Sequence, residues 1–316
     1  MLSKRSSVKL AAALCLAAFI SPPIFAQMKM NESGKKSVSI EGHRGARGYL
    51  PENTIPSFKL ALEQGADTLE MDVVITRDRK VLLSHEPWFS AAISTGPDGK
   101  RIAKEKELDH NIYKLNYAET LGYDAGSLGN PAFPEQKAMP ASKPLLADVF
   151  TAIEAFAKEK SIAPPKYNIE IKSTVKGDGT FHPAPGEFAE LVVKEIDRSG
   201  LTGRSIIQSF DVRPLQHIDK NFPAIRVALL VGGNEDPAEK LAALGFTPAT
   251  LSPHFSLVTT DLVTLCRKKG MKLVPWTVNR TEDLERISGY DIDGVITDYP
   301  DRAVRIFRTI SVELFR

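Results

Sequence analysis

Residues 38–74 read VSIEGHRGARGYLPENTIPSFKLALEQGADTLEMDVV, and this stretch sets the pattern for the rest of the chain. It begins with a short β-branched run, Val38–Gly42, and closes on a second one, Thr68–Val74. The segment between them is amphipathic, starts at the capping pair Asn53-Thr54 and stops at Gly65, as helices do. The stretch therefore predicts a strand, a helix and a second strand of a parallel sheet.

Similar runs recur to the end of the chain, at Tyr167–Lys172, Ile206–Ser209, Ile225–Val231, Ala249–Ser252, Lys272–Thr277 and Gly294–Thr297. Eight strands that alternate with helices over about 280 residues predict a single TIM-type (β/α)8 barrel, which we assign to residues 38–316. An open doubly wound sheet is the alternative, because short strands are easily miscounted.

One segment interrupts the alternation. Between about residues 88 and 145 the chain is rich in Gly, Pro, Asn and Ala and has only short periodic pieces. Long connections of this kind in compact domains usually carry a function. We therefore expect an insertion after the second strand that lies over the mouth of the barrel, with a surface excursion of no role as the alternative.

The first 26 residues have the layout of a secretory signal peptide. Lys4, Arg5 and Lys9 precede the apolar run Leu10–Ile20, and Ala26 offers a cleavage site before Gln27. The run is too short to span a membrane, although an uncleaved anchor is the alternative. We expect an exported protein, periplasmic or secreted and without a stable membrane anchor, in which residues 27–37 form a flexible leader.

The charge of the mature chain excludes some partners. The sequence has 41 Lys+Arg and 39 Asp+Glu, and loss of residues 1–26 leaves 38 against 39. A net charge this small gives no sign of a nucleic acid as partner. Cys266 is then the only cysteine, so the fold contains no internal disulfide. The oligomeric state is not predicted.

Charged side chains gather where the predicted strands end. Glu70 and Asp72 alternate with Met71 on the second strand and so share one face, and Glu170 and Lys172 do the same on the third. Carboxylates on one face of a buried strand are costly unless a positive charge lies between them. A divalent cation with oxygen ligands meets that need.

Two histidines complete this set. His43, followed by Arg44, comes directly after the first strand. If the chain turns back at Asp78-Arg79, His85 lies opposite Asp72 and reaches the same level. Three of the remaining histidines are predicted to be surface residues, namely His110, His182 and His217. The position of His254 is left open.

The ordered motifs resemble those of the glycerophosphodiester phosphodiesterase family, in particular bacterial exported members. They are His43-Arg44-Gly45-Ala46, Pro51-Glu52-Asn53-Thr54, Glu70-x-Asp72, His85, Glu170-x-Lys172, Gln208-Ser209-Phe210, Pro275-Trp276-Thr277-Val278-Asn279 and Asp293-Gly294-Val295-Ile296-Thr297-Asp298. This chain has Glu86 where the family usually has Asp, and Arg79 where it usually has Gly. The resemblance covers the mature chain apart from the insertion.

The resemblance implies an activity and a role for each group. The enzyme would hydrolyse small glycerophosphodiesters to sn-glycerol 3-phosphate and an alcohol. A divalent cation, Ca²⁺ or Mg²⁺, would be held by Glu70, Asp72 and Glu170. The family pattern makes His43 and His85 the acid and base, Arg44 and Lys172 phosphate contacts, and Trp276 part of the substrate pocket. The nucleophile is left open between a substrate hydroxyl, which gives a cyclic phosphate, and water.

Three other functions are compatible with the fold. The first is a barrel-type phospholipase that acts on membrane lipids, and the second is a non-catalytic protein that binds phosphodiesters. The third is a surface protein whose barrel is only a scaffold, which would not need the paired carboxylates. The near-neutral mature chain argues against the first, because lipid surfaces favour basic or apolar rims. The complete set of histidines and carboxylates argues against the second.

Overall fold

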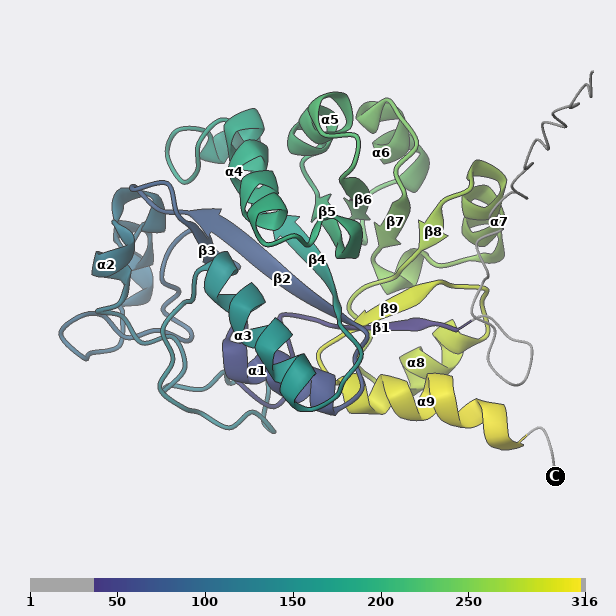
Figure 1. Cartoon of the computed structure of the whole chain (residues 1–316), viewed down its shortest axis with the longest axis horizontal. Coiled ribbons are helices and arrows are strands. Elements are labelled where there is room, and N and C mark those ends of the chain that lie inside the picture. The colour runs from purple at the N-terminus through teal and green to yellow at the C-terminus, as the bar shows by residue number, and fades with distance from the viewer. Residues whose placement is uncertain (1–36, 314–316) are drawn as a thin grey trace, which may run out of the picture.

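The computed structural model describes residues 37–313, and in this part of the chain eight parallel strands form a barrel surrounded by helices (Figure 1). The parallel strands are β1 (Ser39–Gly42), β2 (Thr68–Ile75), β4 (Lys166–Ile171), β5 (Ser205–Ser209), β6 (Arg226–Val231), β7 (Thr250–Pro253), β8 (Lys272–Leu273) and β9 (Gly294–Thr297). The TIM-type fold and the eight strands predicted from the sequence are confirmed. The predicted signal peptide, residues 1–26, and residues 27–36 of the predicted leader lie outside the described residues.

The strands follow the order β8-β7-β6-β5-β4-β2-β1-β9, and each pairs in parallel with its neighbours. Two backbone hydrogen bonds join the ends of this order. The amide of Asp293 donates to the carbonyl of Leu273 at 2.9 Å, and the amide of Ile296 donates to the carbonyl of Pro275 at 2.9 Å. These bonds bring β9 against the β8 side, so the barrel is nearly closed.

The helices that cover the barrel are α1 (Ile55–Glu63), α3 (Leu146–Glu159), α4 (Pro185–Arg198), α5 (Val212–Asn221), α6 (Pro237–Leu244), α7 (Thr260–Lys269), α8 (Thr281–Ser288) and α9 (Pro300–Glu313). The hydroxyl of Thr54 accepts from the amide of Ser57 and caps α1, as the sequence predicts. Gly270 ends α7 in the left-handed region at φ 70°, a conformation that costs glycine little. No helix in the described part is long and apolar enough to cross a membrane.

A short hairpin follows β2, and its register differs by one residue from the prediction. β3 (Val81–Leu83) runs antiparallel to β2, with Val74 opposite Leu82. The turn has three residues rather than two, because Arg79 takes a left-handed φ of 63°. Asp72 therefore lies beside Ser84, whose amide donates to its carbonyl at 3.0 Å, and not opposite His85.

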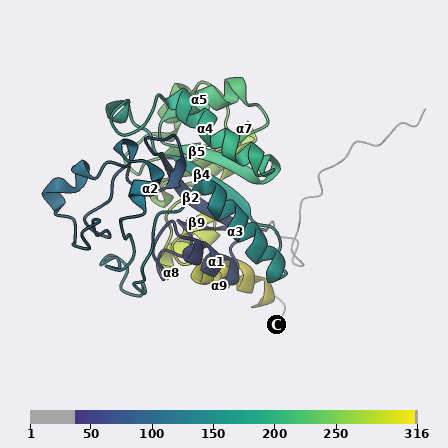
Figure 2. The same cartoon turned by 60° about the vertical axis from the view of Figure 1, so that its left-hand side comes forward.

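The predicted insertion lies between β3 and α3 and has a small core of its own. It contains the short elements η1 (Lys104–Asp109), η2 (Ile112–Lys114) and α2 (Tyr117–Thr120). Its apolar cluster includes Phe89, Ile112 and Tyr123, and the Phe89 and Tyr123 rings stack with centroids 3.8 Å apart. Both views place the insertion on the side toward which β2 points (Figures 1 and 2). That side carries the carboxyl ends of the parallel strands.

Candidate active site

A cavity of about 330 Å³ opens among the residues that follow the strands, a size that suits a small-molecule ligand. Seven of the eight side chains singled out from the sequence line it, namely His43, Arg44, Glu70, His85, Glu170, Lys172 and Trp276. The eighth, Asp72, lies beneath the cavity against Glu70 and Glu170. The structure thus brings the whole predicted set to one place.

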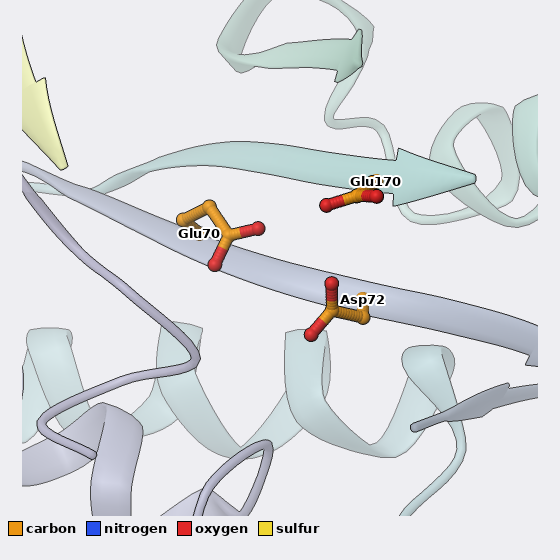
Figure 3. Close-up of side chains that lie close together, drawn as sticks. All are labelled: Glu70, Asp72 and Glu170. Carbon is orange, nitrogen blue, oxygen red and sulfur yellow. The ribbon is translucent and has the colours of Figure 1, made fainter. Parts of the chain in front are cut away.

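Three carboxylates form the floor of this site. β2 and β4 pair in parallel with Asp72 opposite Glu170, and Glu70 lies two residues earlier on the same face. One oxygen from each side chain lies within 4.8 Å of the others. Figure 3 shows the three carboxylates turned toward one another from neighbouring strands. All three are buried, with exposed fractions of 1%, 0% and 6% for Glu70, Asp72 and Glu170.

The protonation of these groups shows how much negative charge the site concentrates. Burial raises the pKa of Glu70 well above its usual value, and the charges of Asp72 and Glu170 raise it further. Burial also raises the pKa of Glu170, against the charge of Lys172. Burial would raise the pKa of Asp72 too, but Arg44, His85 and Lys172 hold it well below its usual value. The protein's own cations therefore hold the pKa of only one of the three carboxylates below its usual value.

The donor set fits a hard divalent cation. It consists of carboxylate oxygens, which Ca²⁺ and Mg²⁺ prefer. Asp72 Oδ1 is buried and has no hydrogen-bond partner in the described part of the chain. The ammonium Nζ of Lys172 is 3.8 Å away from it, beyond hydrogen-bond distance. A buried acceptor without a hydrogen bond is costly, and a cation between the three carboxylates would satisfy it.

Two cationic side chains flank the carboxylates. Arg44 Nε lies 3.1 Å from Asp72 Oδ2, and Lys172 Nζ lies 2.7 Å from Glu170 Oε1. Arg44 has a left-handed φ of 54°, which is uncommon for a side-chain-bearing residue. This turn directs its backbone amide to Glu70 Oε2 at 2.9 Å. The two cations are positioned to meet an anionic ligand above the carboxylates.

His43 is held by a buried carboxylate. Its Nδ1 lies 2.8 Å from Asp298 Oδ1, and its Nε2 faces Glu70 Oε2 at 3.9 Å. Burial lowers the pKa of His43 to about 4, although Asp298 acts against this shift. Asp298 also accepts from Arg47 at 2.7 Å and from Asn279 at 2.6 Å. Burial would raise the pKa of Asp298, but the charges and hydrogen bonds of His43 and Arg47 hold it well below its usual value. An ionised Asp298 fixes the proton of a neutral His43 on Nδ1, which leaves a lone pair on Nε2.

His85 is held in the same way but is more exposed. Its Nδ1 lies 2.7 Å from Glu86 Oε1, and about 30% of its side chain is accessible. Burial would raise the pKa of Glu86, but the hydrogen bond and charge of His85, together with Lys143, keep it at about 2. The replacement of Asp by Glu after this histidine therefore retains a carboxylate partner for the ring.

Three supporting residues were not assigned from the sequence: Asp298, Glu86 and Asn53. Asn53 Nδ2 donates to Asp72 Oδ2 at 2.9 Å, and the amide of Asp72 donates to Asn53 Oδ1 at 3.2 Å. Each of the three lies in a motif that was noted or beside a predicted catalytic residue. Their roles depend on contacts between distant segments, since His43 and Asp298 are 255 positions apart.

The other histidines lie away from this set, with one correction. His182 is buried, with an exposed fraction of 2%, and accepts from the amide of Thr174 at 3.0 Å, so the prediction of a surface residue was wrong. The short turn that begins at Thr174 folds over its ring. His217 pairs with Glu190 at 3.0 Å. His254 does not line the cavity, although its ring lies 5.4 Å from that of Trp276, which does.

Comparison with known proteins agrees with this geometry. The family model described as the glycerophosphoryl diester phosphodiesterase family matches residues 43–302. A glycerophosphodiester phosphodiesterase of Caldanaerobacter subterraneus is 32% identical over 267 residues, covering 84% of this chain and 96% of the relative. A glycerophosphodiester phosphodiesterase of Bacillus subtilis is 29% identical, covering 91% of this chain and 92% of the relative.

Solved structures share the fold. The crystal structure of a putative glycerophosphoryl diester phosphodiesterase from Silicibacter pomeroyi superimposes with a TM-score of 0.77 at 27% identity, covering 87% of this chain and 94% of that one. An Oleispira antarctica phosphodiesterase, solved in complex with sn-glycerol-3-phosphate, gives a TM-score of 0.65 at 21% identity, covering 88% and 97%. The chain therefore belongs to the glycerophosphoryl diester phosphodiesterase family, and it is an enzyme of that class.

Proposed function

We propose that this enzyme hydrolyses glycerophosphodiesters to sn-glycerol 3-phosphate and an alcohol, with a divalent cation at Glu70, Asp72 and Glu170 and proton transfer by His43 and His85. One observation carries the proposal. Two imidazoles line the cavity above the carboxylates, and the Nδ1 of each is anchored to a carboxylate of its own. This arrangement presents both Nε2 atoms for proton transfer at a single bound group.

The two histidines differ in a way that suggests their roles. His43 is buried and neutral, so its Nε2 can accept a proton from a nucleophilic hydroxyl. His85 is more exposed, and its Nδ1 is held by the ionised Glu86, which leaves its Nε2 accessible for proton transfer to the leaving alcohol. We assign His43 as the base and His85 as the acid.

The charge of the phosphodiester is met by the cations around the cavity. Arg44 and Lys172 already lie beside the carboxylates and can donate to phosphate oxygens. When bound, the divalent cation, Ca²⁺ or Mg²⁺, supplies further compensation of the negative charge that grows in the transition state. Trp276 donates its Nε1 hydrogen to the carbonyl of Ser252 at 2.8 Å, which fixes its ring as a wall of the cavity.

The substrate's own hydroxyl is the nucleophile that we favour. The cavity lining contains no serine or cysteine in the described part of the chain, and Cys266 is buried in α7. The glycerol 2-hydroxyl can attack phosphorus through a five-membered ring, and the enforced proximity favours this path over attack by free water. The bond from phosphorus to the alcohol would break as His85 protonates the leaving oxygen, and water would then open the cyclic phosphate to glycerol 3-phosphate.

We also propose that the protein is exported. The sequence of residues 1–26 supports this, with a basic start, an apolar run and a small residue at the end. The protein recovered from outside the cytoplasm of its host should begin at Gln27 by mass spectrometry. Recovery of the uncut chain from the cytoplasm alone would contradict export.

The metal can be tested by its removal. Chelation should abolish the release of glycerol 3-phosphate from glycerophosphocholine, and Ca²⁺ or Mg²⁺ should restore it, because the oxygen donor set suits these ions. Glu70→Gln and Asp72→Asn should prevent the restoration. Full turnover in excess chelator, with no metal found by elemental analysis, would disprove the metal site.

Each histidine should be needed for turnover. His43→Ala and His85→Ala should lower kcat by about 10² to 10⁴-fold, the range for loss of a general acid or base. His217→Ala is the control, because this ring pairs with Glu190 outside the cavity. A loss in the control as large as that in the other two variants would show that the site is assigned wrongly.

The nucleophile can be tested with the substrate. A glycerophosphocholine analogue that lacks only the 2-hydroxyl should be cleaved at least about 10²-fold more slowly, because the proximity advantage is lost. Phosphorus NMR with the normal substrate should detect the cyclic phosphate. Equal kcat values and no cyclic signal would favour attack by water.

A further inference from the structure

The interior of the barrel contains a chain of polar side chains that ends on one of the three carboxylates of the site. Glu41 on β1, Asn168 on β4 and Gln208 on β5 are all buried, with exposed fractions of 7%, 2% and 1%. Asn168 Nδ2 donates to Glu41 Oε2 at 2.9 Å and to Gln208 Oε1 at 3.2 Å. Gln208 Nε2 then donates to Glu70 Oε1 at 3.0 Å. These bonds link four strands across the barrel.

The direction of the chain is set at its Glu70 end. A Glu70 that serves as a metal ligand is ionised and accepts only, so the amide nitrogen of Gln208 must face it. The oxygen of Gln208 then faces Asn168, whose nitrogen is shared between Gln208 and Glu41. A flip of Asn168 would turn its oxygen toward two acceptors.

This direction has a cost. Asn168 Oδ1 is buried and has no hydrogen-bond partner in the described part of the chain. The flipped amide would leave both of its donors without these two acceptors, so the observed orientation makes more hydrogen bonds at the cost of one unpaired oxygen.

Gln208 is also placed to control Glu70 directly. The two oxygens of Glu70 accept one bond each, from the backbone amide of Arg44 at 2.9 Å and from Gln208 at 3.0 Å. Gln208 is the one side chain that donates a hydrogen bond to Glu70 within residues 37–313. Without it, the carboxylate could rotate about its last torsion, because only one oxygen would be held.

We propose that Glu41, Asn168 and Gln208 form a positioning chain that orients Glu70 for cation binding, with Glu41 acting from the opposite end of the hydrogen-bonded path. The inference rests on the proposed metal site. The three residues come from separate parts of the sequence but share one role. Through the oriented side-chain amides of Asn168 and Gln208, they hold one metal ligand in place.

The test measures cation affinity and does not depend on turnover. Calorimetric titration of the metal-free full-length protein with Ca²⁺ and with Mg²⁺ should show that Gln208→Met weakens binding by about 10- to 100-fold, the usual effect of removing a partner of a metal ligand. Methionine keeps the length of the side chain and removes its donor. Asn168→Leu and Glu41→Met should weaken binding by about 5-fold or more, as expected for coupling through an intermediate.

Two further variants separate positioning from general damage. Glu41→Gln keeps an oxygen that can accept from Asn168. Its affinity for the cation should lie within about twofold of the parent's, which is less than a typical coupling effect. Gln216→Met removes an amide that donates to the carbonyls of Ala243 and Leu244 at 3.1 Å each, away from the barrel interior, and should bind like the parent. Circular dichroism and thermal unfolding without metal report whether each variant is folded.

Several outcomes would overturn the chain. One is a folded Gln208→Met or Glu41→Met variant that binds the cation as tightly as the parent does. Another is a Glu41→Gln variant that binds the cation as weakly as Glu41→Met does. If Gln208→Met does not fold, Glu41→Met against Glu41→Gln decides the question. A parent that binds no divalent cation would overturn both the chain and the metal site. A parent that binds the cation but does not cleave glycerophosphocholine would overturn the proposed substrate and leave the chain supported.

Discussion

The parallel pairing of β2 with β4 is the constraint from which the rest of the site follows. Because Asp72 lies opposite Glu170 in this register and Glu70 shares their face, three carboxylates are forced together in a buried place. Such a concentration of charge is unfavourable unless it is compensated. The surrounding residues can be understood as that compensation. Arg44 and Lys172 supply part of it directly, and the remaining deficit is what a divalent cation would fill.

The same demand accounts for the unusual backbone around the first strand. Arg44 and Asn53 both have left-handed φ angles, 54° and 55°, and both contact the carboxylates of β2. Such conformations persist only where the surrounding structure holds them. The loop after β1 is also held at its far end by Arg47. The Nε of Arg47 donates to Asp298, and its guanidinium carbon lies 4.5 Å from the ring centroid of Phe133 in the insertion. The insertion therefore contacts the loop that carries His43 and Arg44 and helps to hold it in place.

The two histidines show one solution applied twice with different surroundings. Each is oriented through Nδ1 by a carboxylate, Asp298 for His43 and Glu86 for His85. Asp298 is completely buried and shared with Arg47 and Asn279, whereas Glu86 is adjacent in sequence and part of a more open rim. His43 is therefore enclosed by its surroundings, whereas the ring of His85 remains accessible from the open side.

The sequence by itself determined the strand and helix pattern, the barrel and which charged side chains gather at one cavity, because period-2 alternation and helix caps are local signals and barrel strands end at one face. It did not determine the register of the β2–β3 hairpin, where a left-handed Arg79 made a three-residue turn in place of two, nor the burial of His182. Only the tertiary structure decided which carboxylate orients which imidazole and how Glu41, Asn168 and Gln208 meet inside the barrel. The physical reason is that hydrogen-bond partners on different strands are set by barrel closure and register, which no local pattern encodes.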